Sequence, residues 1–368
     1  MKQNKDIELM IRYVKQQIKS LRKNIAKKIL DKKYRKSNIF DFDAKNIKSI
    51  LVFRNDDKIG DMVISTLIFR EIKKHYPDIK IIVLCGKNNA EILKYNKNVD
   101  LTYIISGNFL RDLPVYINLR RQHISLGIDF YTFGLCFIPM LILRIVAVNV
   151  LIGFYKNLYN IYDLSIDKDF FNEHITKRYE YVLKFFKIDN QNLNYDVFTS
   201  DLEDNTAKEL LKKSTTRYNI VLNPFAASKH RSFSFNKLQS LISDLEKKFD
   251  CSIFVICNKK NRKKLHALKN NKIFICSFNS ILSSASLIRY SDIIITPDTS
   301  IVHIASAFNK KTVALYLDYS KISEKINVIW GPNNKNAISI SLNIKSGTEN
   351  DIENISNNDI LNAVEKLL

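Results

Sequence analysis

Residues 49–66 read SILVFRNDDKIGDMVIST, an apolar run followed by a polar turn and a second apolar stretch. The first run predicts a buried strand, and the apolar spacing after Gly60 predicts a helix. The turn carries three acids, Asp56, Asp57 and Asp61, in a chain that has only 8 glycines. Strand, short loop and helix in this order predict the first unit of a parallel α/β sheet, whose strand-end loops are the usual place for ligands.

The same alternation continues along the chain. Short apolar runs that fit strands lie at 49–53, 80–85, 101–105 and 127–130, and then at 220–222, 252–256, 272–276, 292–295 and 312–315. Stretches long enough for helices separate them, because parallel neighbours need crossover connections. We therefore expect an α/β fold of two Rossmann-like, doubly wound domains.

The domain limits follow from changes in composition. We predict an N-terminal domain at 47–190 and a second domain at 217–345, with the polar segment 187–216 as the boundary region. A helical stretch at 172–186 leads into that segment. Residues 350–368 are expected to end the chain with a helix.

The net charge of +21 is unevenly distributed. Residues 1–38 hold 13 Lys or Arg and 3 acids, a net charge of +10, and their apolar residues recur at helical spacing. This pattern predicts an extra basic amphipathic helix before the first domain. Such a helix suits an anionic membrane surface, and the alternative is a helix packed on the body of the protein.

The five cysteines form no CxxC pair and no metal-ligand spacing, and we find no cleavable secretory signal. The longest apolar run, 135–152, is interrupted by Pro139, Arg144 and Asn149, so we interpret it as a buried helix and a strand and not as a membrane span. A reducing cytoplasm is the expected location.

Several chemistries lack their usual sequence patterns. Neither half has a GxGxxG after its first strand, and GxxxxGK[ST] is absent, which argues against hydride transfer and P-loop chemistry. No cluster of His, Cys and carboxylates predicts a bound metal. We therefore expect no metal and no cofactor.

The second domain offers the loop TPDTSIVHIASA at 296–307, directly after a predicted strand. Asp298 or Thr299 can cap the helix that follows, and its free N–H groups and positive dipole end suit a diphosphate. A plain capped helix is the alternative. A second loop, LNPFAASKHRSF at 222–233, places Lys229, His230 and Arg231 at the same sheet edge, where cationic side chains could neutralise a phosphate.

Together these loops resemble glycosyltransferase family nine, the heptosyltransferases of the lipopolysaccharide inner core. The resemblance covers most of 47–332 and rests on GDMVIST, on LNPFAASKHRSF, and on DIIITPDTSIVHIASAFNKKTVALY followed by WGP at 330–332. It implies a GT-B architecture, in which the two domains face each other across a cleft, with the acceptor on the first domain and an ADP-sugar on the second.

The resemblance also implies roles for individual residues. Asp61 would be the catalytic base that deprotonates the acceptor hydroxyl in an inverting displacement, and a simple N-cap is the alternative for this residue. The residues expected to bind substrate are Gly60, Asp57, Lys229, Arg231, Asp298, Thr299, Ser300 and His303. Gly60 is expected to allow a tight backbone turn and to leave room for a sugar.

Two departures from the family pattern concern the donor. Ser300 stands where a glycine is common, and the loop at 257–261 lacks the Gly-rich or acidic character often found near the nucleoside. The main hypothesis is an enzyme on the cytoplasmic face of a bacterial inner membrane that moves heptose from an ADP-sugar to a lipid-linked oligosaccharide. The alternatives are another nucleotide-sugar or glycan acceptor, and a non-catalytic protein that binds nucleic acid, a partner we do not expect.

Overall fold

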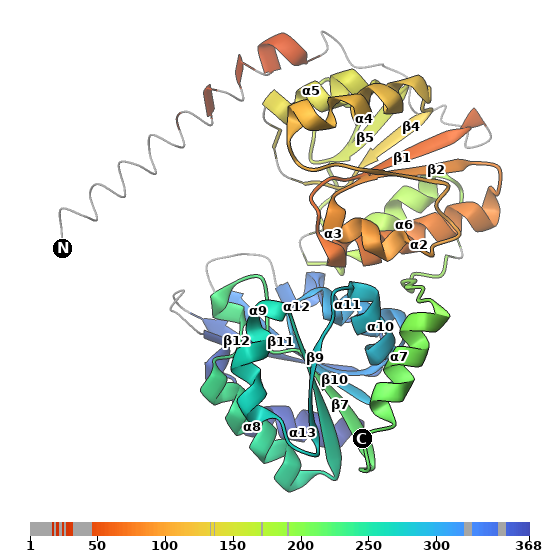
Figure 1. Ribbon diagram of the computed structural model, residues 1–368. Helices are drawn as coiled ribbons and strands as arrows, with labels where there is room; N and C mark the ends of the chain where they lie inside the picture. The colour runs from red at the N-terminus through yellow and green to blue at the C-terminus, as the bar shows by residue number, and fades with distance from the viewer. Residues whose placement is uncertain are drawn as a thin grey trace. The chain divides into compact units, whose positions relative to one another are not determined.

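A computed structural model describes the chain in two compact units (Figure 1). The described residues are 17, 20, 21, 24, 25, 27–31, 46–132, 134–135, 137–170, 172–189, 191–319, 326–344 and 351–368. The first unit comprises residues 1–57, 76–87 and 99–168, and the second comprises 58–75, 88–98 and 169–368. Most of the predicted N-terminal helix lies outside the described residues.

The first unit is built on a six-stranded parallel sheet in the order β3-β2-β1-β4-β5-β6. The strands are β1 (Ser49–Arg54), β2 (Lys80–Cys85), β3 (Leu101–Ile104), β4 (Leu126–Asp129), β5 (Val150–Phe154) and β6 (Leu164–Ile166). Helices α4 (Phe109–Arg121) and α5 (Phe137–Val146) pack apolar residues against one face of this sheet, which carries Leu51, Phe53, Ile82 and Leu84.

The second unit has its own six-stranded parallel sheet, in the order β12-β11-β10-β7-β8-β9. Its strands are β7 (Tyr218–Leu222), β8 (Cys251–Cys257), β9 (Ile273–Ser277), β10 (Ile293–Pro297), β11 (Lys311–Tyr319) and β12 (Ala337–Ile344). Its helices are α2 (Ile59–His75), α6 (Thr176–Phe185), α7 (Asp201–Leu211), α8 (Phe235–Lys248), α9 (Lys259–Leu265), α10 (Ile281–Tyr290), α11 (Ser300–Ala307), α12 (Ile326–Ile329) and α13 (Asn357–Leu367). Helix α3 (Lys87–Ala90) has its first residue in the first unit and the other three in the second. Two doubly wound α/β sheets were predicted, and the structure confirms them.

Helix α2 belongs to the second unit although it directly follows β1 in the chain. The guanidinium of Arg70 donates to Asp196 at 2.7 Å, and the backbone N–H of Asp196 donates to Thr66 at 2.8 Å. The hydroxyls of Ser65 and Tyr179 lie 3.0 Å apart. These bonds hold α2 against segments that come more than 100 residues later.

The polar segment 187–216 contains a helix that the composition did not predict. Helix α7 begins after Ser200, whose side chain accepts from the backbone N–H of Glu203, and Glu203 in turn accepts from the N–H of Ser200. This capping box is a recognised start signal for helices. The composition gave no sign of this helix, because its start signal is local and is independent of apolar content. Strands β6 and β12 were also missed.

The last described residues of the N-terminal segment are attached to the first unit. Leu30 packs against the core of that unit, and its carbonyl accepts from the Arg144 guanidinium at 2.7 Å. The Asp31 carboxylate accepts from the backbone N–H groups of Asn160 and Ile161 at 3.0 and 2.6 Å. The end of this segment therefore has a fixed position in the first unit.

Candidate active site

The candidate site of the second unit lies where the first turns of α2 and α11 meet. A Cβ added to Gly60 would lie 2.9 Å from Cδ2 of His303 and 3.5 Å from the Cα of Ser300. Only a residue without a side chain permits this approach. Two helix N-termini, each with free N–H groups and a positive dipole end, are thereby brought together, an arrangement that favours an anion.

This contact corrects the role that we expected for Gly60. The residue lies inside α2, and among the described glycines only Gly107 has a positive φ. A special turn conformation therefore does not explain the glycine. Its missing side chain is required because His303 occupies the space beside it.

Asp61 is the third residue of α2 and is largely buried, with 9% of its surface exposed. It is not an N-cap, since the helix begins at Ile59 and the N–H of Met62 already donates to the carbonyl of Lys58. Its carboxylate lies 3.8 Å from the ammonium of Lys58, which is exposed. The first turn of a helix is a favourable place for an acidic side chain, because the positive end of the helix dipole lies there.

Thr299 is the N-cap of α11, as one of the two predicted alternatives had it. Its hydroxyl accepts from the N–H of Ile301 and from the side-chain amide of Asn223 at 3.2 Å, and it lies 3.1 Å from the hydroxyl of Thr296. The Asn223 amide also donates to Thr296 at 3.0 Å. Asn223, the first residue after β7, was not among the predicted site residues, although a polar residue directly at a strand end is a usable signal.

Arg231 and Asp298 form the charged pair of the site. One guanidinium nitrogen donates to the Asp298 carboxylate at 2.6 Å and to the Asp298 carbonyl at 3.2 Å, while Nε donates to the hydroxyl of Ser228. Because β7 and β10 are parallel neighbours, the loops that follow them end side by side. Burial raises the pKa of Asp298, and the adjacent Arg231 opposes that rise. Asp298 thus orients the arginine.

His303 is buried one turn into α11. Burial, with a smaller contribution from His174, lowers its pKa to about 3, so the ring is neutral at ordinary pH. Within the described part of the chain, its Nδ1 has no hydrogen-bond partner. The ring packs edge-on against Tyr195, with centroids 6.0 Å apart. His303 can therefore offer a neutral hydrogen bond but cannot offer a positive charge.

Two further predicted residues lie away from these contacts. Lys229 is exposed in the short 3-10 turn that also carries Arg231. Asp57 belongs to the first unit and has a φ of 56°. A Cβ on Gly86 would collide with the Asp57 carboxylate, so this glycine accommodates the Asp57 side chain.

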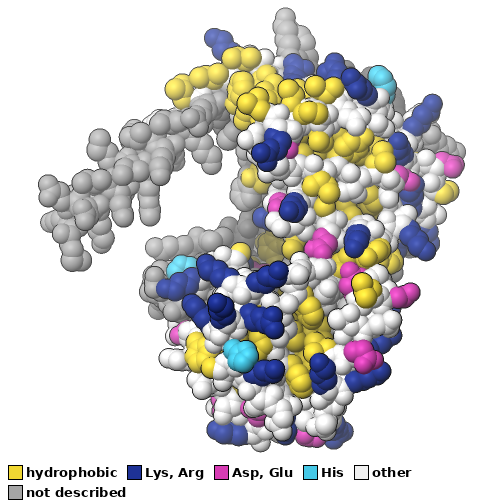
Figure 2. All heavy atoms as spheres, in the orientation of Figure 1, with side chains coloured by type: hydrophobic (Ala, Val, Ile, Leu, Met, Phe, Trp, Pro, Cys, Tyr) yellow, Lys and Arg dark blue, Asp and Glu magenta, His cyan; other side chains and the backbone are white. Residues whose placement is uncertain are grey.

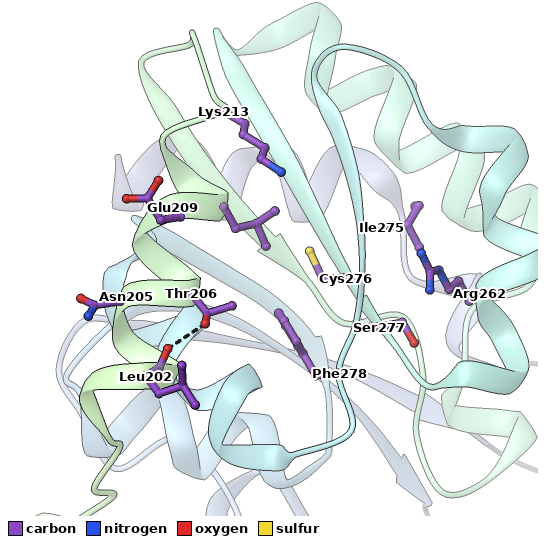
Figure 3. Close-up of a pocket in the computed structure, with 11 residues that line it drawn as sticks. Leu202, Asn205, Thr206, Glu209, Lys213, Arg262, Ile275, Cys276, Ser277 and Phe278 are labelled. Atoms are coloured by element: carbon purple, nitrogen blue, oxygen red, sulfur yellow. Dashed lines mark hydrogen bonds between the residues drawn. The ribbon is translucent and has the colours of Figure 1, made fainter.

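The second unit also has a groove beside its edge strand β9 (Figure 3). It has a volume of about 570 Å³, with α7 on one side and β9 and Arg262 on the other. None of the predicted site residues lines it. Its apolar lining includes Leu210, Ile275 and Phe278, and Lys213 and Arg262 supply its positive charges.

In the residues that the structure describes, no group of three or more His, Cys, Asp or Glu is arranged to hold a metal ion. Among the same residues, no helix has the length and apolar character needed to cross a bilayer.

Solved structures share the architecture of this chain. A family 9 glycosyl transferase from Veillonella parvula DSM 2008 superposes with a TM-score of 0.72 at 16% identity, over 89% of this chain and 98% of that one. The ADP-heptose lipopolysaccharide heptosyltransferase II of Escherichia coli superposes with a TM-score of 0.66 at 17% identity, over 87% and 98%. The fold is therefore that of the GT-B glycosyltransferases.

The sequence relationship is more specific. Residues 141–358 match the model of glycosyltransferase family 9 (heptosyltransferase), and the chain belongs to that family. It is also 26% identical over 321 residues to the putative lipopolysaccharide heptosyltransferase 4 of Escherichia coli (strain K12), which covers 86% of this chain and 87% of the relative. The chain is thus a glycosyltransferase of the heptosyltransferase type, as the sequence motifs predicted.

Proposed function

We propose that this enzyme transfers a heptose from an ADP-sugar to a lipopolysaccharide inner-core acceptor, with inversion at the anomeric carbon. The observation that carries the proposal is the contact of Gly60 with Ser300 and His303. It puts Asp61, the next residue, in the first turn of one helix beside the N-terminus of another. A base and an anion-binding helix tip are what an inverting transfer from a diphosphate sugar requires.

The proposed reaction assigns one task to each part of the site. Asp61 accepts the proton of the acceptor hydroxyl while the oxygen attacks the anomeric carbon. The bond between that carbon and the diphosphate oxygen breaks, and its electron pair stays on the leaving ADP. Arg231 and the free N–H groups at Ser300 stabilise the added negative charge, because they are oriented before the reaction begins.

The remaining site residues support this arrangement. Thr299 and Asn223 fix the start of α11, and Asp298 orients the Arg231 guanidinium. His303 contributes a neutral donor or acceptor. Lys229, exposed in the same turn as Arg231, adds positive charge where a diphosphate would enter.

The donor and the acceptor define the nearest alternative, a family member that uses another nucleotide-sugar or another glycan. The loop after β8 motivates it, since Asn258 there is occupied as the N-cap of α9 and no acid stands at 257–261. A thermal-shift screen of nucleotide-sugars separates the donors, because a ligand at 100 times its Kd stabilises the fold by about 2.7 kcal/mol. We expect ADP-heptose to give the largest shift.

The proposal includes a peripheral position on the inner face of the bacterial inner membrane. Leu21, Ile25 and Ile29, spaced by four residues, are 61%, 44% and 65% exposed. An apolar stripe in a segment of high positive charge suits an anionic membrane surface. Removal of residues 1–26 should reduce binding to anionic liposomes and leave transfer to a soluble acceptor intact.

Substitution of the proposed base is the decisive test. Asp61→Asn keeps the shape of the side chain and removes its basicity, so transfer should fall about 10²–10⁴-fold. The thermal shift produced by ADP-heptose should persist, because the donor residues are unchanged. Near-normal transfer by Asp61→Asn would remove Asp61 from the mechanism.

A further inference from the structure

Helix α9 and the residues after it form a cationic surface in the second unit. Residues 258–272 contain seven Lys or Arg and no acid. They are Lys259, Lys260, Arg262, Lys263, Lys264, Lys269 and Lys272, and all but Lys272 are exposed. Figure 2 shows this gathering of Lys and Arg side chains over α9.

Several other lysines on or next to the helices of the unit have acidic partners. Lys177 and Lys184 pair with Glu180, and Lys212 and Lys248 pair with Glu209 and Glu365. Among the residues that the structure describes, none of the seven cations forms an ion pair with an acid. On α9 the like charges stand three and four residues apart, a spacing at which they repel each other. An external anion would relieve that repulsion.

The surface continues at both sides. Helix α9 starts at the carboxyl end of β8, the parallel neighbour of β7, and the loop after β7 carries Lys229 and Arg231. The cationic surface therefore begins at the same sheet edge as the candidate site. On the other side, Arg262 forms one wall of the groove in Figure 3, and Lys213, which follows the end of α7, lines the opposite wall.

We propose that α9, with Lys269 and Lys272, is a second contact surface for the membrane and binds the anionic headgroups of a phospholipid bilayer. The charge is spread over several exposed side chains, which a flat anionic membrane surface can contact together. Phe and Tyr side chains, which would stack on bases, are absent from 258–272, and this favours a bilayer over single-stranded nucleic acid. The choice of a bilayer rests on the proposed function, in which the acceptor is lipid-linked. Contact at α9 would hold the strand-end loops close to that acceptor.

The test uses the full chain and sedimentation with vesicles of phosphatidylglycerol and phosphatidylcholine. One variant changes Lys259, Lys260, Lys263 and Lys264 to Gln. The matched control changes four exposed lysines of the same unit, Lys74, Lys97, Lys247 and Lys335, to Gln, so that both variants lose the same charge. A near-surface lysine is worth roughly a fivefold change in affinity. We expect at least tenfold weaker binding for the α9 variant and less than threefold for the control.

Hydrogen exchange on the bound vesicles locates the contact. The amides of α9 should gain protection with anionic vesicles and not with phosphatidylcholine alone. Equal weakening of both variants, or unprotected α9 amides, would overturn the proposal, and so would tighter binding to single-stranded RNA than to the vesicles at the same salt. These measurements do not involve sugar transfer, so a negative result would overturn the α9 surface and leave the proposed reaction standing. The proposed reaction is tested separately, by transfer to a soluble acceptor in Asp61→Asn.

Discussion

Two of the Arg–Asp pairs in the second unit differ in character. Arg231 and Asp298 meet at 2.6 Å where two strands end, and Arg289 and Asp204 meet at 3.0 Å between α10 and α7. Asp204 accepts further hydrogen bonds from Thr199, Ser286 and Tyr290. Among the described residues, the Asp298 side chain accepts only from Arg231.

For this reason the pKa values of the two carboxyl groups are shifted in opposite directions. Burial alone would raise the pKa of Asp204, but its hydrogen bonds and Arg289 favour the charged form and lower the pKa. Burial raises the pKa of Asp298, and Arg231 offsets only part of that effect. Asp204, whose carboxylate has several hydrogen-bond donors, links α7 to α10. Arg231 is partly exposed and has N–H donors that Asp298 does not use, so this pair is suited to bind a ligand.

Of the two pairs, the one with Arg231 is expected to give the larger effect on activity. Arg231→Gln removes the guanidinium proposed to hold the diphosphate, and kcat/KM should fall about 10²–10³-fold, as for the loss of one preorganised donor to a developing charge. Lys247→Gln, which removes an exposed charge on α8, should leave transfer within a factor of two.

The variant leaves Asp298 without its partner, so stability must be measured as well. The double variant Arg231→Gln with Asp298→Asn should recover the Tm of the parent and stay inactive. If the double variant regained activity, the pair would be structural, like that of Asp204, and the contrast between the two pairs would be lost.

A smaller effect is expected from Asp204, and on stability only. Asp204→Asn leaves Arg289 and three hydroxyl donors with a poorer acceptor, at a cost of about 2 kcal/mol. The thermal midpoint should fall by roughly 4–8 °C, while kcat/KM measured well below that midpoint stays unchanged. Asp201→Asn, an exposed acid at the start of the same helix, is the control and should cost less than about 1 kcal/mol.

The sequence predicted the features that depend on chain-local patterns. Both sheets, the strand-end loops and the start of α11 at Thr299 follow from apolar runs and capping residues. The order of the strands places Arg231 next to Asp298. The sequence also predicted that these two loops lie at one edge of the sheet, because both follow parallel strands.

Features that depend on packing between distant segments could not be predicted in this way. The side-chain space at Gly60 is occupied by His303, more than 240 positions later, and no local pattern records that contact. The role of Asn223 in fixing Thr299 is of the same kind. Helix α7 is different, because its capping box can be recognised in the sequence. The polar composition of the segment led us to interpret it only as a domain boundary.

The smallest expected effect is the pH dependence of stability that arises from Asp204 and Asp298. The pKa of Asp204 is lower in the folded chain than in the unfolded one, so its stabilising contribution is present above pH about 4 and is lost as the pH falls through the folded pKa. The pKa of Asp298 is higher in the folded chain, so its charged form disfavours folding at neutral pH, and protonation relieves this as the pH falls through the raised pKa. Below about pH 4, the advantage of the parent over Asp204→Asn should shrink. Between pH 7 and about pH 4, in contrast, the parent should gain stability relative to Asp298→Asn, by less than about 1 kcal/mol, in urea unfolding at each pH. Equal slopes for the two variants would mean that both carboxylates have the same kind of environment, and Asp298 would then lose its distinction from a purely structural acid.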